Sequence, residues 1–167
     1  SRHKPLREPA GPAWQTSGGE DDRRYDSRCG CRDTEVRQLA MAGYYACITH
    51  MDHQIGRLLQ AIQAEGILED SIILFTSDHG EELFDHGLFR KARPYQGSIH
   101  IPLIVRVGKN IRSRQQPAVC EGVVELRDIL PTLLSYAGQP VRDTDGVDLR
   151  PILEGESAQS RNFLHGE

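Results

Sequence analysis

The stretch Ser71-Ile72-Ile73-Leu74-Phe75-Thr76-Ser77-Asp78-His79-Gly80 decides the fold class of this chain. Residues 71–76 form a short, nearly continuous apolar run, which is typical of a strand buried on both faces of a parallel sheet. Polar residues end the run abruptly. Because ligands of open α/β sheets bind just beyond the carboxyl ends of strands, Asp78 and His79 are placed for chemistry.

The segments on either side of this strand predict an α/β protein. From Thr34 to Ile62 apolar residues recur mostly at spacings of three and four, which predicts a long helix with one buried face. Asp33 or Thr34 is the expected N-cap of that helix, and Gly66 is its expected stop. A helix followed by a buried strand indicates the α/β class.

The carboxyl-terminal half predicts three more elements. A second buried strand is expected at 103–107 and a short last helix at 148–153. Between them, 125–137 reads as a helix that bends at Pro131 and stops at Gly138. The apolar residues expected to face inward on that helix are Leu126, Leu130, Leu133 and Leu134. Residues 1–33 form an irregular amino-terminal segment rich in prolines and mixed charges, and 34–167 form the structured part.

Length and charge exclude some classes of protein. At 167 residues the chain is one ordinary domain or a large piece of a bigger one, and because it begins without Met we expect a longer parent sequence. A net charge of −4 without a basic stripe argues against nucleic-acid binding. No apolar run approaches the roughly 18 residues that span a bilayer, so we expect no membrane span. Nothing in the sequence indicates a localisation.

The cysteines do not predict a zinc site or a disulfide framework. They lack the paired spacing of zinc ligands, so free or buried thiols are expected. The four positions are Cys29, Cys31, Cys47 and Cys120.

The densest polar segment lies between the two predicted strands. A turn through Gly80 could aim Asp78 and His79 at one point, where an oxygen and a nitrogen ligand would suit a divalent cation. Lys91 follows thirteen positions after Asp78, and its ammonium could meet a sulfate or phosphate oxygen beside that cation. The alternative is a solvated connection, because Asp-His-Gly alone is not specific.

An ordered series of motifs resembles the sulfatase family. Its central part comprises 71–81, Asp85-His86-Gly87-Leu88, Lys91, Pro94-Tyr95 and 101–105. Further segments of the family's pattern are similar to Tyr44-Tyr45-Ala46, 52–59, 128–134 and 145–151. At the amino terminus, His3-Lys4-Pro5 is similar to a His-x-Pro segment of sulfatases.

The resemblance implies part of an alkaline-phosphatase-like α/β sandwich with a mostly parallel central sheet. Members of the family hydrolyse sulfate esters with a formylglycine and a cation, here Ca2+ or another divalent ion such as Mg2+ or Mn2+. It implies that Asp78 and His79 bind this metal, that Lys91 contacts the sulfate, and that His3 donates to the ester oxygen. The implied substrate is a sulfated small molecule or a sulfated glycan.

The chain also departs from the family's pattern. None of its cysteines stands in the Cys-x-Pro-x-Arg setting of the modified residue, and the amino-terminal acidic pair that completes the metal site is absent. Gln96 and Ala92 stand where relatives commonly have Glu and Gly. We therefore expect a carboxyl-terminal sulfatase fragment that is inactive alone. Two alternatives are a phosphate or phosphonate monoester hydrolase of the same superfamily and a non-catalytic remnant.

Overall fold

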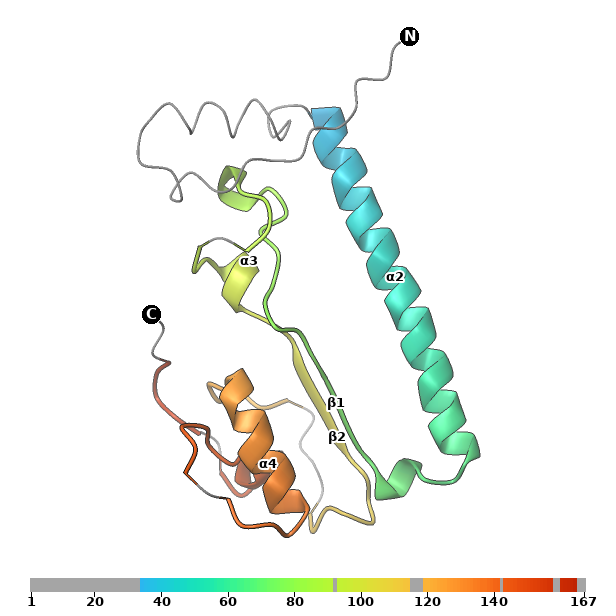
Figure 1. Ribbon diagram of the computed structural model, residues 1–167, viewed down its shortest axis with the longest axis vertical. Coiled ribbons are helices and arrows are strands. Elements are labelled where there is room, and N and C mark those ends of the chain that lie inside the picture. The colour runs from blue at the N-terminus through green and yellow to red at the C-terminus, as the bar shows by residue number, and fades with distance from the viewer. Residues whose placement is uncertain (1–33, 92, 115–118, 142, 158–159, 165–167) are drawn as a thin grey trace. The chain divides into compact units, whose positions relative to one another are not determined.

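The structure is a computed structural model that describes residues 34–91, 93–114, 119–141, 143–157 and 160–164 (Figure 1). The chain divides into two compact units, one made of 1–58 and 77–102 and the other of 59–76 and 103–167. The segment 1–33, expected to be irregular, lies outside the described residues. Across the described ranges, no helix combines the length and hydropathy needed to cross a bilayer.

The long helix α2 (Thr34–Ala64) has the bounds that its sequence predicts. It begins at Thr34 and is followed by Gly66, whose φ of 73° suits a glycine that ends a helix. The expected buried face is wrong, because none of the helix residues is buried, and Leu58, for example, is 60% exposed. Of its apolar residues, Ala40 and Met41 pack against the buried side chain of Phe84, so little of the described chain covers the apolar stripe.

The two predicted strands form one antiparallel pair, β1 (Ile72–Thr76) and β2 (Leu103–Val107), preceded by the 3-10 turn η2 (Leu68–Asp70). Ile72 is paired with Val107 and Thr76 with Leu103, and the strands run side by side in Figure 1. The mostly parallel sheet expected from the sequence is therefore wrong for this pair. Among its described residues the 77–102 connection holds two short helical turns, η3 (Asp85–Gly87) and α3 (Gln96–Ile99), and no long helix of the kind that usually links parallel strands.

The expected burial of both strand faces is also wrong. Ile104 is 62% exposed and Phe75 is exposed as well, because the sheet has only two strands among the described residues. Polar contacts stabilise the open end of the pair instead. The Glu69 carboxylate accepts a hydrogen bond from the Lys109 backbone N–H at 3.0 Å and pairs with Arg106 at 2.8 Å.

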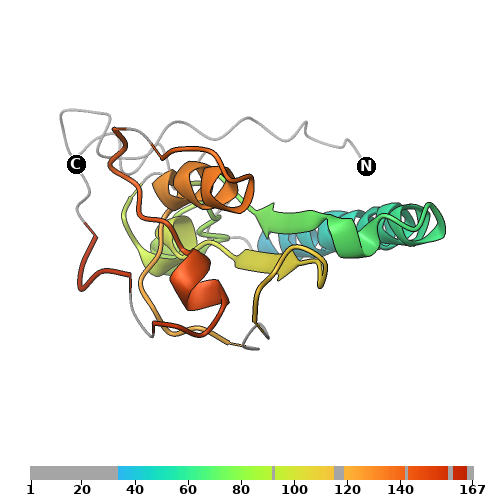
Figure 2. The same ribbon diagram turned by 90° about the horizontal axis from the view of Figure 1, so that it is seen from below.

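The carboxyl-terminal part comprises the 3-10 turn η4 (Leu126–Asp128), α4 (Ile129–Tyr136) and α5 (Arg150–Leu153). Helices α4 and α5 contact each other and are drawn in orange and red in Figure 2. The fully buried Asp128 organises this part. Its carboxylate accepts backbone N–H groups from Glu125 at 2.9 Å and Val147 at 2.8 Å, and it pairs with the Arg161 guanidinium.

The inward face predicted for the 125–137 helix is wrong. Leu130 is 60% exposed, whereas Pro131 and Thr132 are buried. The Thr132 hydroxyl donates to the Asp128 carbonyl at 2.6 Å and accepts the Leu149 N–H at 2.9 Å. The face of α4 that carries Thr132 therefore turns inward in place of the leucines. Leaving the buried Asp128 carbonyl and Leu149 N–H unpaired would cost more free energy than exposing a leucine.

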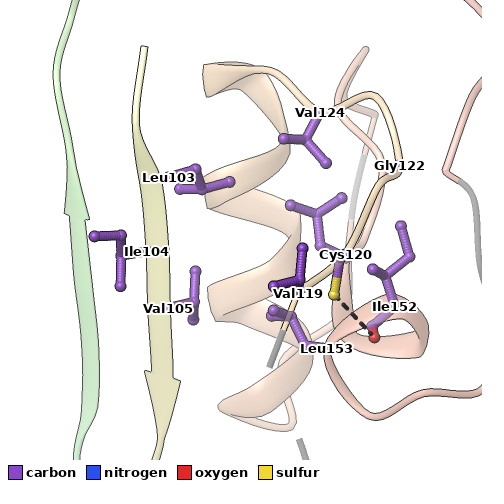
Figure 3. Close-up of a pocket in the computed structure, with 10 residues that line it drawn as sticks. Leu103, Ile104, Val105, Val119, Cys120, Gly122, Val124, Ile152 and Leu153 are labelled. Carbon is purple, nitrogen blue, oxygen red and sulfur yellow. Dashed lines mark hydrogen bonds between the residues drawn. The ribbon is translucent and has the colours of Figure 1, made fainter. Parts of the chain in front are cut away.

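An apolar pocket of about 280 Å³ lies beside β2 in the second unit (Figure 3). Its walls come from 103–105, 119–124 and 149–153, and the Cys120 thiol lies 3.8 Å from the Ile152 carbonyl oxygen. Asp78, His79 and Lys91 do not line it.

Candidate functional site

Asp78 and His79 form a compact pair directly after β1. The His79 backbone N–H donates to Asp78 Oδ1 at 3.0 Å, and His79 Nε2 lies 3.5 Å from Asp78 Oδ2. His79 Nδ1 lies 2.7 Å from the Gly80 carbonyl oxygen, which can only accept, so Nδ1 carries the proton of the neutral ring. Nε2 is then left with its lone pair, on the same side as an exposed carboxylate oxygen.

This geometry fits two ligands of a single cation. Two donors that each lie about 2.4 Å from a calcium ion at right angles to each other are about 3.4 Å apart. The observed separation of Nε2 and Oδ2 is 3.5 Å. No group of three or more His, Cys, Asp or Glu side chains among the described residues could hold a metal. A cation held by this pair would therefore need further ligands from outside the described residues.

Gly80 fixes the turn that follows the pair. Its N–H donates to the Ser98 carbonyl at 2.7 Å, so the backbone after His79 is tied to helix α3. A Cβ atom at this position would lie 1.9 Å from the Gly97 carbonyl oxygen. Only glycine permits this approach of two main chains.

The segment after Gly80 folds back on itself at its neck, 81–82 against residue 90. The Glu82 N–H donates to the Arg90 carbonyl at 3.0 Å, and one carboxylate oxygen of Glu81 accepts the Arg90 N–H. Lys91 is the next residue. This closure holds Arg90, the residue before Lys91, against Glu81 and Glu82, which follow Asp78 by three and four positions. The Lys91 side chain is exposed and makes no hydrogen bond or ion pair with another described residue.

Inside the closed loop the backbone is strained. Four residues other than glycine have left-handed φ values: Leu83 at 45°, Phe84 at 74°, His86 at 50° and Arg90 at 73°. Such conformations are rare for these residue types and persist where surrounding contacts hold them, often at functional sites.

The Phe84 ring supplies one of those contacts. It is buried, stacks on Phe89 with ring centroids 5.3 Å apart, and lies 5.4 Å below the Arg37 guanidinium. The apolar anchor therefore fixes the middle of the loop.

Glu82 provides a second anchor, which sequence reasoning missed. Its carboxyl group is only 2% exposed, and one of its oxygens accepts the Ser98 hydroxyl at 2.5 Å. Its other oxygen, Oε2, is buried without a hydrogen-bond partner among the described residues. An acidic residue in a polar loop is usually solvated, so only its position right after Asp-His-Gly could have drawn attention to it.

Two other histidines lie in the segments that resemble the family. His86 stacks on Tyr95 with ring centroids 4.3 Å apart. His3, predicted to donate to the ester oxygen, lies outside the described residues, as do Cys29, Cys31 and Ala92.

Comparisons with known proteins converge on one family. The family model described as Sulfatase matches residues 2–139. An arylsulfatase of Clostridium perfringens is 39% identical over 97% of this chain and 34% of its own length. The chain thus spans about a third of that relative.

Solved structures show the same likeness. One, a protein in complex with its substrate D-glucosamine-2-N,6-O-disulfate, matches with a TM-score of 0.67 and 29% identity over 89% of this chain and 32% of its own. A phosphonate monoester hydrolase from Silicibacter pomeroyi matches with a TM-score of 0.67 and 35% identity over 74% of this chain and 24% of its own. The expected fold class, part of an alkaline-phosphatase-like α/β fold, is confirmed by these neighbours.

Proposed function

Because the chain belongs to the sulfatase family, we propose that it is part of a cation-dependent hydrolase of sulfate esters, with Asp78, His79 and Lys91 in its reacting centre. The observation that carries this proposal is the loop neck. It brings the Lys91 backbone back beside the segment that presents the Asp78–His79 pair.

Asp78 and His79 would hold the divalent cation, Ca2+ or another ion such as Mg2+ or Mn2+. Their donor atoms are a carboxylate oxygen and an imidazole nitrogen, and the hydrogen bond between Nδ1 and the Gly80 carbonyl fixes the ring so that Nε2 can bind. When bound, such an ion supplies concentrated positive charge for the oxygens of the transferring group.

Lys91 would contact the sulfate and offset the negative charge that gathers on it during transfer. An exposed ammonium without a competing carboxylate among the described residues is suited to meet an anion. His3 would donate a proton to the leaving ester oxygen, as the family resemblance implies. The nucleophile would come from the rest of a longer parent chain.

The proposed substrate class is a sulfated small molecule or a sulfated glycan. The named substrate of one structural relative, a glucosamine carrying two sulfates, supports this choice. A phosphate or phosphonate monoester is the second candidate, because a phosphonate monoester hydrolase is similar at 35% identity and the same three side chains would suit its charge. Turnover of matched sulfate and phosphate esters by a full-length enzyme that carries this chain would separate the two.

A calcium titration of a full-length enzyme that carries this chain tests the cation pair. Asp78→Asn removes the charged oxygen that a hard cation prefers, so it should weaken calcium binding. Asp85→Asn is the matched control, because Asp85 Oδ1 also accepts the next His N–H at 3.0 Å, while its Oδ2 lies 3.9 Å from His86 Nε2. Equal calcium affinity of the two variants would contradict the assignment.

A further inference from the structure

One oxygen of the Glu81 carboxylate closes the neck of the loop from the side chain. It accepts the N–H of Leu83 at 3.1 Å and the N–H of Arg90 at 2.5 Å. The first bond is local, whereas the second joins residues nine positions apart. Because the Arg90 carbonyl accepts the Glu82 N–H, Arg90 is held at both of its backbone polar groups by two consecutive glutamates.

The closed loop stores strain that this contact has to offset. Four left-handed residues lie between Glu82 and Lys91, and each costs about 1 kcal/mol or more relative to an ordinary conformation. Phe84 holds the middle of the loop but makes no bond across the neck. Charge-assisted hydrogen bonds such as those of Glu81 are about twice as strong as neutral ones, so the carboxylate is the strongest single bond across it.

The distance between the two halves of the proposed site depends on this neck. A connection of thirteen residues could reach about 45 Å when extended, whereas the three residues from Asp78 to Glu81 reach only about 10 Å. Since Lys91 directly follows Arg90, the bond from Arg90 to Glu81 limits how far its ammonium can move from Asp78. Glu81 differs from the cation pair, because one oxygen of its carboxylate is already engaged by the backbone N–H groups of Leu83 and Arg90.

We propose that Glu81 is a positioning residue that sets the Lys91 ammonium beside the Asp78–His79 pair. This inference rests on the proposed function, which assigns the cation to that pair and the anion to Lys91. The inference adds that the distance between Lys91 and the Asp78–His79 pair is set by the Glu81 carboxylate, which touches neither the cation nor the substrate.

Three variants separate this role from general effects on the loop. Glu81→Ala removes the acceptor, whereas Glu81→Gln keeps an oxygen that can accept both N–H groups. Asp85→Ala is the matched control, because the Asp85 side chain lies in the same loop but among the described residues contacts the neighbouring His86, through its N–H and Nε2, and not Arg90.

Paramagnetic Mn2+ bound to a full-length enzyme that carries this chain, isotopically labelled, provides the first measurement. It broadens nearby NMR signals, and the effect falls steeply with distance. We expect the His79 ring and the Lys91 side chain to be broadened in the wild type, Glu81→Gln and Asp85→Ala. In Glu81→Ala, His79 should stay broadened and Lys91 should lose part of its broadening, because the Glu82 N–H still donates to the Arg90 carbonyl but the side-chain bond is gone. Undiminished broadening of Lys91 in Glu81→Ala would overturn the inference and leave the cation pair intact.

Amide exchange of Arg90 provides a second measurement that needs no cation. Loss of this charge-assisted hydrogen bond, worth about 1.5–3 kcal/mol, should speed exchange roughly 10- to 160-fold in Glu81→Ala and much less in the other two variants. An unchanged exchange rate of the Arg90 amide in Glu81→Ala would refute the role of Glu81. Failure of His79 to bind Mn2+ would count against the proposed function and not against this role. If Glu81→Ala loses the helical circular dichroism of α2, Glu81→Asp replaces it, since its side chain is one methylene too short to reach Arg90.

Discussion

Replacing Gly80 with alanine should open the loop neck and separate the proposed site from helix α3. The added Cβ would lie 1.9 Å from the Gly97 carbonyl oxygen, so the two main chains must move apart by more than an ångström. That movement breaks the 2.7 Å hydrogen bond from the Gly80 N–H to the Ser98 carbonyl. The lost bond costs about 1 kcal/mol and the overpacking about 1–3 kcal/mol, so we expect about 2–4 kcal/mol against the closed neck.

Native-state hydrogen exchange would measure this opening. A cost of about 2–4 kcal/mol corresponds to roughly 30- to 800-fold faster exchange of amides that open with the neck. The amides of Gly80 and Glu82 report on it, because the first donates to the Ser98 carbonyl of α3 and the second to the Arg90 carbonyl across the neck. Gly56→Ala is the control, since a Cβ there meets nothing within 4 Å and should stabilise α2 by about 1 kcal/mol. Unchanged exchange of the Gly80 and Glu82 amides in Gly80→Ala would refute the reasoning.

Three other changes should have measurable effects. Lys91→Ala in a full-length enzyme that carries this chain should lower kcat by about 10²–10³-fold with the exchange pattern of the loop unchanged, and near-normal turnover would contradict its role. The Lys109 backbone N–H, and after it the Arg106 guanidinium, lowers the pKa of Glu69 below its ordinary 4.5, so Glu69 stabilises the fold above that pH and this contribution is lost as pH falls through the lowered pKa. Urea midpoints measured against pH should therefore be flatter below 4.5 for Glu69→Gln. Burial, followed by the nearby Glu154 carboxylate, raises the pKa of Tyr136 to about 12, so its contribution to stability is complete below pH 10 and is lost as pH rises toward 12. Tyr136→Phe should remove that alkaline loss in the same titration, and an identical alkaline profile would argue against it.

Local patterns predicted the elements, and long-range contacts decided their surroundings. The bounds of α2 follow from its apolar periodicity and from Gly66, and those of the strand at 103–107 follow from its apolar run. These signals come from residues that are neighbours in the sequence. The sequence predicted more buried residues in α2 and the strands than the structure has. An apolar face such as that of β2 is covered only if another element packs on it. The direction of the strand pair also depends on the 77–102 connection, whose lack of a long helix is not evident from apolar runs alone.

The candidate site was only partly readable from the sequence for a similar reason. The position of Asp78 and His79 at a strand end follows from an abrupt change of polarity, which any reading of the sequence detects. The neck of the loop cannot be predicted in this way, because a glutamate that bonds to the backbone nine residues away looks the same in sequence as a solvated one. Left-handed Leu83 and Phe84 are equally hidden, since neither residue type favours that conformation.

The uncovered stripe of α2 governs how this chain behaves at high concentration. Tyr44, Ile48, Met51 and Leu58 follow one another at intervals of four, three and seven residues, which places exposed apolar groups along one seam of a 31-residue rod. At 1.5 Å per residue the rod is about 46 Å long. A net charge of −4 is too small to keep such seams apart, so clustering of copies through α2, and not precipitation at the isoelectric point, should set the solubility limit.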